Sequence, residues 1–194
     1  MRTASVMRET RETRVRLELN LDGTGKARVK TGVGFFDHML DAMCRFGRID
    51  LELTCAGDLD VDAHHTVEDT GICIGTAIRD ALGDRMGIRR VAHSYVPMDE
   101  SLAFAALDMS NRSMFVLDSP LPDIMIGGMS AQLAEEFFRA VCASAGLTLH
   151  MRVDGRNAHH MIEALFKAFG RALDDAKEID PRVAGEIPST KGTL

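Results

Sequence analysis

The sequence predicts an α/β (α+β) fold made of two similar half-domains, each a β-sheet covered on one side by two helices. The pattern His-His-x-x-Glu occurs twice, at residues 64–68 and 159–163. Each copy opens a segment with helical periodicity, and each closes the same series of elements: strand, strand, helix, strand, helix. Helices that follow strands and carry one apolar face imply a sheet that is covered on one side.

The first half spans residues 1–90. Alternating apolar and polar residues flank Asp22-Gly23-Thr24-Gly25 and predict a β-hairpin. A helix is then expected up to Gly47, a strand after it, and a helix that begins at the first motif with Asp62 as its N-cap. The expected ranges are strands 14–22 and 26–31, helix 34–47, strand 48–57 and helix 64–84.

The second half spans residues 91–181 and repeats this order. The boundary is expected near 87–98, where apolar periodicity is lost, and packing about a pseudo-twofold axis should bring the two motif helices together. The tail 182–194 is rich in Gly, Pro, Ser and Thr, which predicts a mobile segment that something else must order. The expected ranges are a strand pair at 101–110 and 112–118, helix 130–146, strand 147–155 and helix 157–176.

Composition argues against a nucleic-acid-binding, membrane-spanning or secreted protein. The net charge is −6 and no basic run appears, which argues against a nucleic-acid partner. No stretch approaches the ~18 apolar residues of a membrane span, and the N-terminal residues lack the apolar core of a signal peptide. None of the cysteines forms a CxxC pair, so they are expected to be reduced core thiols of a cytoplasmic protein: Cys44, Cys55, Cys73 and Cys142.

The repeated motif indicates a metal site. On a helix, the two His and the Glu fall within an arc of about 100° on one face. Two imidazoles and a carboxylate form a metal half-site, and two half-sites predict two ions or one ion held between the halves. His38, beside an acidic residue, and His150, on the strand before the second motif, would complete two sites of three His and one Glu each.

Positive charge near the motifs suggests an anionic ligand. Lys167 lies four residues after Glu163, within the same arc as the candidate ligands. In the tail, Ser189-Thr190-Lys191-Gly192 offers hydroxyl, amine and backbone donors for a phosphate. Three further arginines at loop positions are ambiguous by themselves: Arg89, Arg90 and Arg112.

Several segments together resemble the imidazoleglycerol-phosphate dehydratase family of histidine biosynthesis, in its monofunctional form. They are RETRET, LDGTGK, TGVGFFDHML, DAHHTVED, LTLHMRVDGRNAHHMIEALFKAFGRAL and IPSTKG, and they extend from Arg8 to Gly192. The resemblance implies a duplicated fold like ribosomal protein S5 domain 2. It also implies a 24-subunit homo-oligomer built through trimers, with active sites between subunits and two Mn²⁺ ions in each site.

The resemblance also implies residue roles. Glu12, which spacing alone would leave as an exposed charge, matches the catalytic acid/base. Phosphate would be held by Arg90, Arg112, Lys167, Ser189 and Lys191, although Arg89 beside Arg90 leaves open which of the two reaches it. The metal ligands would be His38, His64, His65, Glu68, His150, His159, His160 and Glu163.

The implied reaction converts D-erythro-imidazoleglycerol phosphate to imidazole-acetol phosphate. The proton to be lost is not next to a carbonyl, so the substrate imidazole must act as the electron sink, and metal binding would favour its imidazolate form. Two other functions fit a chain with this many possible metal ligands: a di-metal phosphoester hydrolase and a metal-stabilised assembly without catalysis. A hydrolase usually carries more carboxylate ligands, and a bare metal site would not need Lys167 or the tail.

Overall fold

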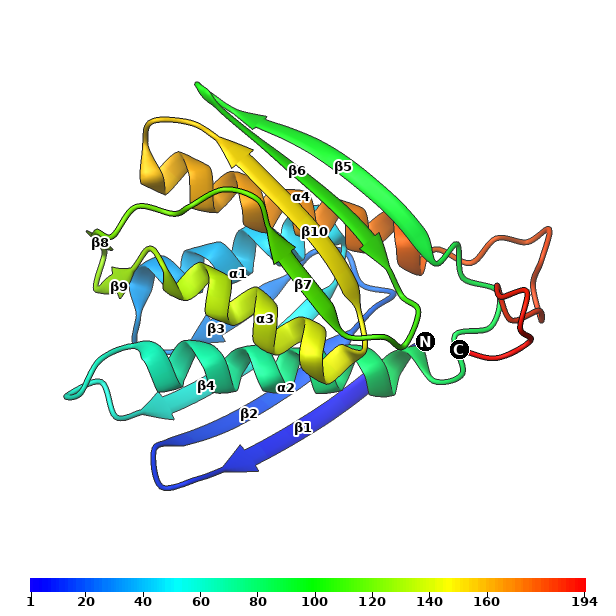
Figure 1. Cartoon of the computed structure of the whole chain (residues 1–194). Helices are drawn as coiled ribbons and strands as arrows, with labels where there is room; N and C mark the ends of the chain where they lie inside the picture. The colour runs from blue at the N-terminus through cyan, green and yellow to red at the C-terminus, as the bar shows by residue number, and fades with distance from the viewer.

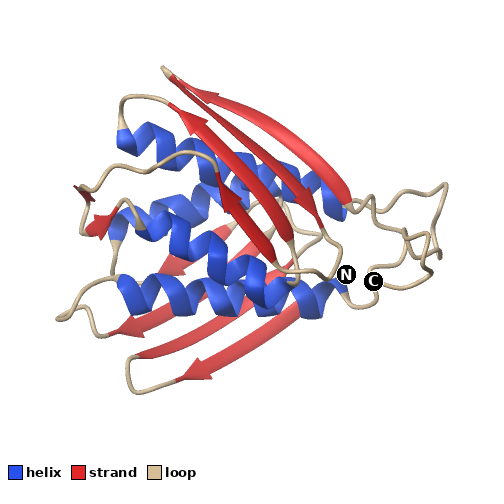
Figure 2. Ribbon diagram, in the orientation of Figure 1, coloured by secondary structure: helices blue, strands red, loops and turns tan.

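The computed structural model describes residues 1–194 as two four-stranded sheets with four helices between them (Figure 2). The first sheet has the order β1-β2-β4-β3 and the second has the order β5-β6-β10-β7. The elements of the first half are β1 (Thr3–Glu9), β2 (Thr13–Asn20), β3 (Ala27–Lys30), α1 (Gly34–Gly47), β4 (Asp50–Gly57) and α2 (His64–Leu82).

The second half repeats the first element by element, which confirms the predicted duplicated α/β fold. It also contains one small inserted hairpin, β8–β9. Its elements are β5 (Val91–Met98), β6 (Ser101–Asp108), β7 (Met114–Leu117), β8 (Met125–Ile126), β9 (Met129–Ser130), α3 (Leu133–Ala145), β10 (Thr148–Asp154) and α4 (Ala158–Lys177).

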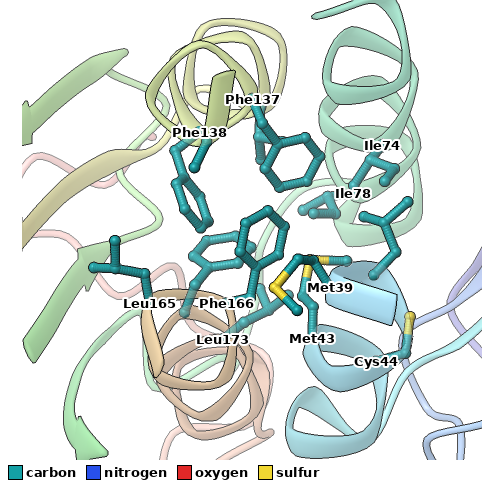
Figure 3. Close-up of a cluster of buried hydrophobic side chains, with 14 of the residues drawn as sticks. Met39, Met43, Cys44, Ile74, Ile78, Phe137, Phe138, Leu165, Phe166 and Leu173 are labelled. Carbon is teal, nitrogen blue, oxygen red and sulfur yellow. The ribbon is translucent and has the colours of Figure 1, made fainter. Parts of the chain in front are cut away.

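Each sheet buries one face, as the alternation in the sequence predicts. Along β2 every second residue is buried, and the residues between them are exposed. The buried faces cover the helical layer, and its centre is filled by aromatic and sulfur-containing side chains (Figure 3). Phe137 and Phe166 stack with ring centroids 5.0 Å apart, and Met39 and Met43 are fully buried beside them.

The two motif helices do not pack on each other as expected. In the helical layer α2 packs mainly on α3, and α4 packs mainly on α1. Each motif helix therefore lies against the other half's non-motif helix. Glycines allow these close crossings, because a Cβ on Gly75 would meet the Val141 carbonyl and a Cβ on Gly170 would meet the Met43 carbonyl.

The predicted strand pairing is wrong in both halves. β2 and β3 do not form a hairpin; β2 pairs with β1 and β4, and β3 runs parallel to β4. The second half repeats this, with β10 between β6 and β7. The cause is the helix between β3 and β4, which returns the chain for a parallel pairing that local patterning cannot reveal.

The segment expected to be a linker near 87–98 contains the edge strand β5, and β1 was likewise not predicted. The alternation of β5 is not visible in its sequence because polar and apolar residues occur on both of its faces, with Ser94 inward among Ala92, Val96 and Met98. Ser94 is buried and its Oγ donates to the Ala168 carbonyl at 2.7 Å, whereas Tyr95 points outward and is exposed. Large apolar side chains outside and a polar side chain inside together hide the alternation that would predict a strand.

The segments that carry the candidate site residues lie at two ends of the molecule. Helices α2 and α4 begin at the left of Figure 1, and the tail lies at the right. The tail contacts the end of the first half, where Gly87 N–H donates to the Glu186 carbonyl at 2.8 Å. No helix is both long enough and apolar enough to cross a membrane.

Candidate active site

Both motif helices begin in the same way. Asp62 Oδ1 accepts the His64 N–H at 2.7 Å, and Asn157 Oδ1 accepts the His159 N–H at 2.9 Å. The N-cap of α2 is Ala63, so the predicted N-cap, Asp62, lies one position too early, although its side chain still satisfies a free backbone N–H of the first turn. These contacts fix the first histidine of each motif at the start of its helix.

The second motif forms a compact cluster with α1. His38 Nε2 lies 3.3 Å and His159 Nε2 3.1 Å from the same oxygen, Glu163 Oε2. The donor atoms of these three residues all lie within 4.8 Å of one another, a spacing that suits ligands of one metal ion. Glu163 is buried, whereas the two imidazoles are partly exposed, so the cluster opens toward solvent.

Lys167 completes this cluster. Its Nζ lies 2.7 Å from Glu163 Oε1, one helical turn away, as its spacing predicts. Burial would raise the pKa of the Glu163 carboxyl, but Lys167 and then His38 hold that pKa below its ordinary value. The carboxylate is therefore kept ionised, which is the state that binds a cation.

The first motif is more open. His64 Nε2 lies 4.0 Å from Glu68 Oε2, whereas His65 turns away and its Nδ1 donates to Asp58 Oδ2 at 3.0 Å. His65 Nε2 lies 3.7 Å from Oε1 of Glu12, which lies in the β1–β2 turn. A cleft of about 940 Å³ opens beside His64, between the start of α2 and the start of α3.

The second histidine of the other motif behaves likewise. His160 Nδ1 donates to Glu100 Oε2 at 2.8 Å, in the β5–β6 turn, and the Glu100 contact raises the pKa of His160. Asp58 raises the pKa of His65 in the same way. In each motif the first His lies near the motif's Glu, at 4.0 Å for His64 and 3.1 Å for His159, whereas the second His contacts a carboxylate outside the motif.

His150 does not join either motif within one chain. Its neighbours Leu149 and Met151 are buried, whereas His150 is exposed on the outer face of the second sheet. The helices and the other candidate ligands lie on the opposite face of this sheet.

Four of the five candidate phosphate residues gather at the far end of the molecule. Arg90 binds Asp108 through two contacts of 2.7 and 3.0 Å and donates to the Pro188 carbonyl at 2.7 Å. Arg112 lies 3.5 Å from the same Asp108. Arg89 instead pairs with Glu178 at 3.0 Å. The contact with Pro188 places Ser189 and Lys191 next to this group, which we call the arginine cluster: Arg90, Arg112, Ser189 and Lys191.

The arginine cluster and the metal-ligand cluster are far apart in one chain. Arg90 N–H donates to the Ala176 carbonyl, near the end of α4, whereas His159 lies in the first turn of that helix. At 1.5 Å per residue, these two positions are separated by about 25 Å. Lys167 alone among the candidate phosphate residues lies beside the metal ligands.

Comparison with known proteins identifies the family. A model of the family described as imidazoleglycerol-phosphate dehydratase matches residues 31–173. A relative of that name from Desulfitobacterium hafniense is 56% identical over all of this chain and 99% of its own length. Another from Symbiobacterium thermophilum is 57% identical, covering all of this chain and 93% of its own. The chain belongs to the imidazoleglycerol-phosphate dehydratase family.

Solved structures of the imidazoleglycerol-phosphate dehydratase family have the same fold. The enzyme of Staphylococcus aureus aligns over 92% of this chain and 99% of its own, with a TM-score of 0.83 and 35% identity. The Pyrococcus furiosus protein, solved in complex with (S)-C348, covers 97% of this chain and all of its own, with a TM-score of 0.83 and 32% identity. Members of the family are hydro-lyases.

Sequence patterns singled out the candidate histidines and glutamates of this chain but not their carboxylate neighbours, Asp58 and Glu100. Asp58 and Glu100 lie in loops, where charged residues are common, and no fixed spacing links them to the motifs. The duplication could have pointed to Glu100, because Glu12 and Glu100 each directly precede the second strand of their half. Of these two glutamates, only Glu12 was named from the sequence.

Proposed function

We propose that this chain dehydrates D-erythro-imidazoleglycerol phosphate to imidazole-acetol phosphate, a step of histidine biosynthesis, with two Mn²⁺ ions in each active site. Membership of the dehydratase family supports the reaction. The observation that carries the metal-dependent part is the cluster of His38, His159 and Glu163, whose donor atoms lie within 4.8 Å beside the cationic Lys167.

The residues fit a transition-metal ion. Imidazole-rich donor sets suit Mn²⁺, Fe²⁺, Co²⁺ or Zn²⁺ better than Mg²⁺, and the family resemblance favours manganese among these. Each motif offers a first His paired with its Glu and a second His held by another carboxylate. The proposed ligands are His38, His64, His65, Glu68, His150, His159, His160 and Glu163.

When bound, the two ions would supply positive charge that favours the deprotonated form of the substrate imidazole. The chain's own contribution to proton transfer is Glu12. Its side chain is half-exposed and its Oε1 lies 3.7 Å from His65 Nε2, so it borders the first motif and stays accessible to a substrate. A carboxylate there can remove the proton from the carbon next to the one that loses hydroxyl.

Phosphate recognition divides the site between copies of the chain. The arginine cluster lies about 25 Å along α4 from His159, which is too far for one small substrate to touch both. Arg90 is favoured over Arg89, because Arg90 faces Arg112 and the tail whereas Arg89 pairs with Glu178. We therefore propose that the arginine cluster of one subunit serves the metal site of another.

This division supports the 24-subunit homo-oligomer that the family resemblance implies. His150 lies on the outer face of its sheet, so as a ligand it would serve a site on a neighbouring copy. Tyr95 and Val91 also leave apolar surface exposed on the same sheet. The four buried, unpaired cysteines suit a reducing compartment, and we place the protein in the cytoplasm.

One assay tests the proposal against its alternatives. Purified protein is mixed with Mn²⁺ and imidazoleglycerol phosphate, and both the keto product and inorganic phosphate are measured. The proposal predicts the keto product with phosphate retained. Release of inorganic phosphate would instead identify a di-metal phosphoester hydrolase, and no reaction of a metal-loaded assembly would identify a structural role.

A further inference from the structure

The second histidine of each motif is held by a carboxylate that no sequence pattern marks. His65 Nδ1 lies 3.1 and 3.0 Å from the two oxygens of Asp58, and His160 Nδ1 lies 2.8 Å from Glu100. An ionised carboxylate can only accept, so in both rings Nδ1 carries the proton and Nε2 is left with the lone pair. Both rings therefore present the same nitrogen outward.

The two carboxylates come from non-equivalent places in the duplicated fold. In the first sheet Thr13 lies opposite Gly57, so Glu12 faces Asp58 one residue further along. In the second sheet Leu102 lies opposite Asp154, so two residues further along Glu100 faces Arg156. Glu100 is thus the counterpart of Glu12, and the counterpart of Asp58 is Arg156.

The two equivalent glutamates have different surroundings. Glu100 Oε1 also accepts the backbone N–H groups of Arg156 and Asn157 at 3.2 and 2.8 Å, and its side chain is 27% exposed. Glu12 makes no such contacts, and its side chain is 53% exposed. Asp58, 28% exposed, is anchored because its N–H donates to the Glu12 carbonyl at 3.1 Å.

We propose that Asp58 and Glu100 are positioning residues that fix the tautomer and orientation of His65 and His160 as metal ligands. We further propose that Asp58 takes this role in the first half so that Glu12 stays free to move a proton. The inference rests on the proposed function for the role of Glu12, but the metal-binding part does not depend on it.

The role of Glu12 would change if Glu12, rather than Asp58, held the ring of His65. A ligand imidazole binds a metal through a nitrogen lone pair, and a carboxylate on the other nitrogen fixes the ring and increases its basicity. If Glu12 held His65 as Glu100 holds His160, the base would be committed to its own ligand shell. With Asp58 in that role, Glu12 borders the first motif but does not accept the Nδ1 proton of His65.

The first test is manganese affinity, measured without substrate by competition with a chelator. Asp58→Ala and Glu100→Ala should each lose about 10- to 100-fold in Mn²⁺ affinity. Asp58→Asn should recover most of the loss, because its amide oxygen still accepts the Nδ1 proton. Asp60→Ala is the matched control, an exposed acid of the same loop without a side-chain contact, and should bind like the parent.

The second test compares the equivalent glutamates. Glu12→Ala should lower kcat and keep Mn²⁺ affinity, whereas Glu100→Ala should lower Mn²⁺ affinity. Glu100→Gln keeps the shape and one acceptor oxygen, so it reports on the contact even if the alanine variant folds poorly.

The positioning proposal is overturned if Asp58→Ala and Glu100→Gln both bind Mn²⁺ like Asp60→Ala. The division of roles is overturned if Glu12→Ala loses as much affinity as Glu100→Ala. Either result stands whether or not dehydration is observed.

Discussion

At the scale of single residues, the proposed function makes Glu12 the residue that moves a proton, and its half-exposed carboxylate lies 3.7 Å from His65 Nε2. Glu12→Gln should lower kcat by ~10²–10⁴-fold, the usual contribution of a general base. Substrate binding and metal content should stay close to those of the parent. Steady-state kinetics combined with metal analysis checks this, and a near-normal kcat would remove Glu12 from the mechanism.

Lys191, in the arginine cluster, and Lys167, beside the candidate metal ligands, test the phosphate assignment in both clusters. A charge-assisted contact contributes roughly 1.5–3 kcal/mol, so Lys191→Ala should weaken substrate binding by about 10- to 150-fold with little change in metal occupancy. Lys167→Ala should act in the same direction. Arg182→Ala, which removes a tail charge that pairs only with Asp180, is the control.

The readouts for these variants are KM and inhibition by inorganic phosphate. Phosphate should inhibit the parent and the control alike, and should inhibit both lysine variants less. Unaltered KM and unaltered phosphate inhibition in both lysine variants would show that the anion is held elsewhere and that the tail is a solvated end.

The sequence predicted individual residues where their spacing repeated. The duplicated motif marked six candidate ligands, and the helical spacing placed Lys167 correctly beside Glu163. Asp58 was missed because its contact with His65 depends on the path of the loop before α2, and Glu100 because its partner His160 is 60 residues away and is reached only once β6 lies beside β10. The Glu100 contact depends on sheet register, which a single sequence does not specify.

At the scale of elements, the crossings of α1 with α4 and α2 with α3 determine where the motif helices lie. Gly170→Ala should destabilise the fold, because the new Cβ would clash with the Met43 carbonyl and would lie 3.1 Å from the Gly47 nitrogen. Overpacking of this kind costs about 1–3 kcal/mol. Gly34→Ala, in α1 with open space around it, should be neutral or slightly stabilising.

Denaturant unfolding of the two glycine variants checks this prediction. A Gly170→Ala variant as stable as Gly34→Ala would mean that α1 and α4 can separate without cost and that the His38–Glu163 contact is not fixed by their packing.

Elements were predicted well where the signal is local. Apolar spacing predicted all four helices to within a few residues, because a helix is stabilised by residues near it in sequence. The predicted strand pairing was wrong because β3 and β4 are brought together by the intervening α1. Strand β5 was missed because both of its faces mix polar and apolar residues, so its pairing with β6 is what makes it a strand. Both failures reflect tertiary contacts rather than the propensities of the strands.

At the scale of the whole molecule, metal and assembly should be coupled. If ligands from different subunits share each ion, removal of divalent metal should abolish activity and break up the large particle. Sedimentation velocity before chelation, after chelation and after Mn²⁺ is restored measures this. A particle unchanged in size and activity after verified metal loss would contradict the shared-ligand arrangement.

The duplicated halves were visible in the sequence, but the distance between the metal ligands and the arginine cluster was not. Residues that the family resemblance assigns to one site lie near opposite ends of α4, and only the fold reveals that about 25 Å of helix separates them. This separation is the strongest argument that a complete site needs more than one copy of the chain.

Co-assembly of two inactive variants tests that central claim most directly. His159→Ala disables the metal-ligand cluster and Arg112→Ala disables the arginine cluster, and the two are co-expressed with different tags and purified as mixed particles. If each site takes these residues from different subunits, about one quarter of the sites in an equal mixture are intact, and activity should return to that level. His159→Ala co-assembled with Glu163→Ala should stay inactive, because both changes lie in one cluster of one chain. A His159→Ala and Arg112→Ala mixture no more active than its parents would contradict the shared site.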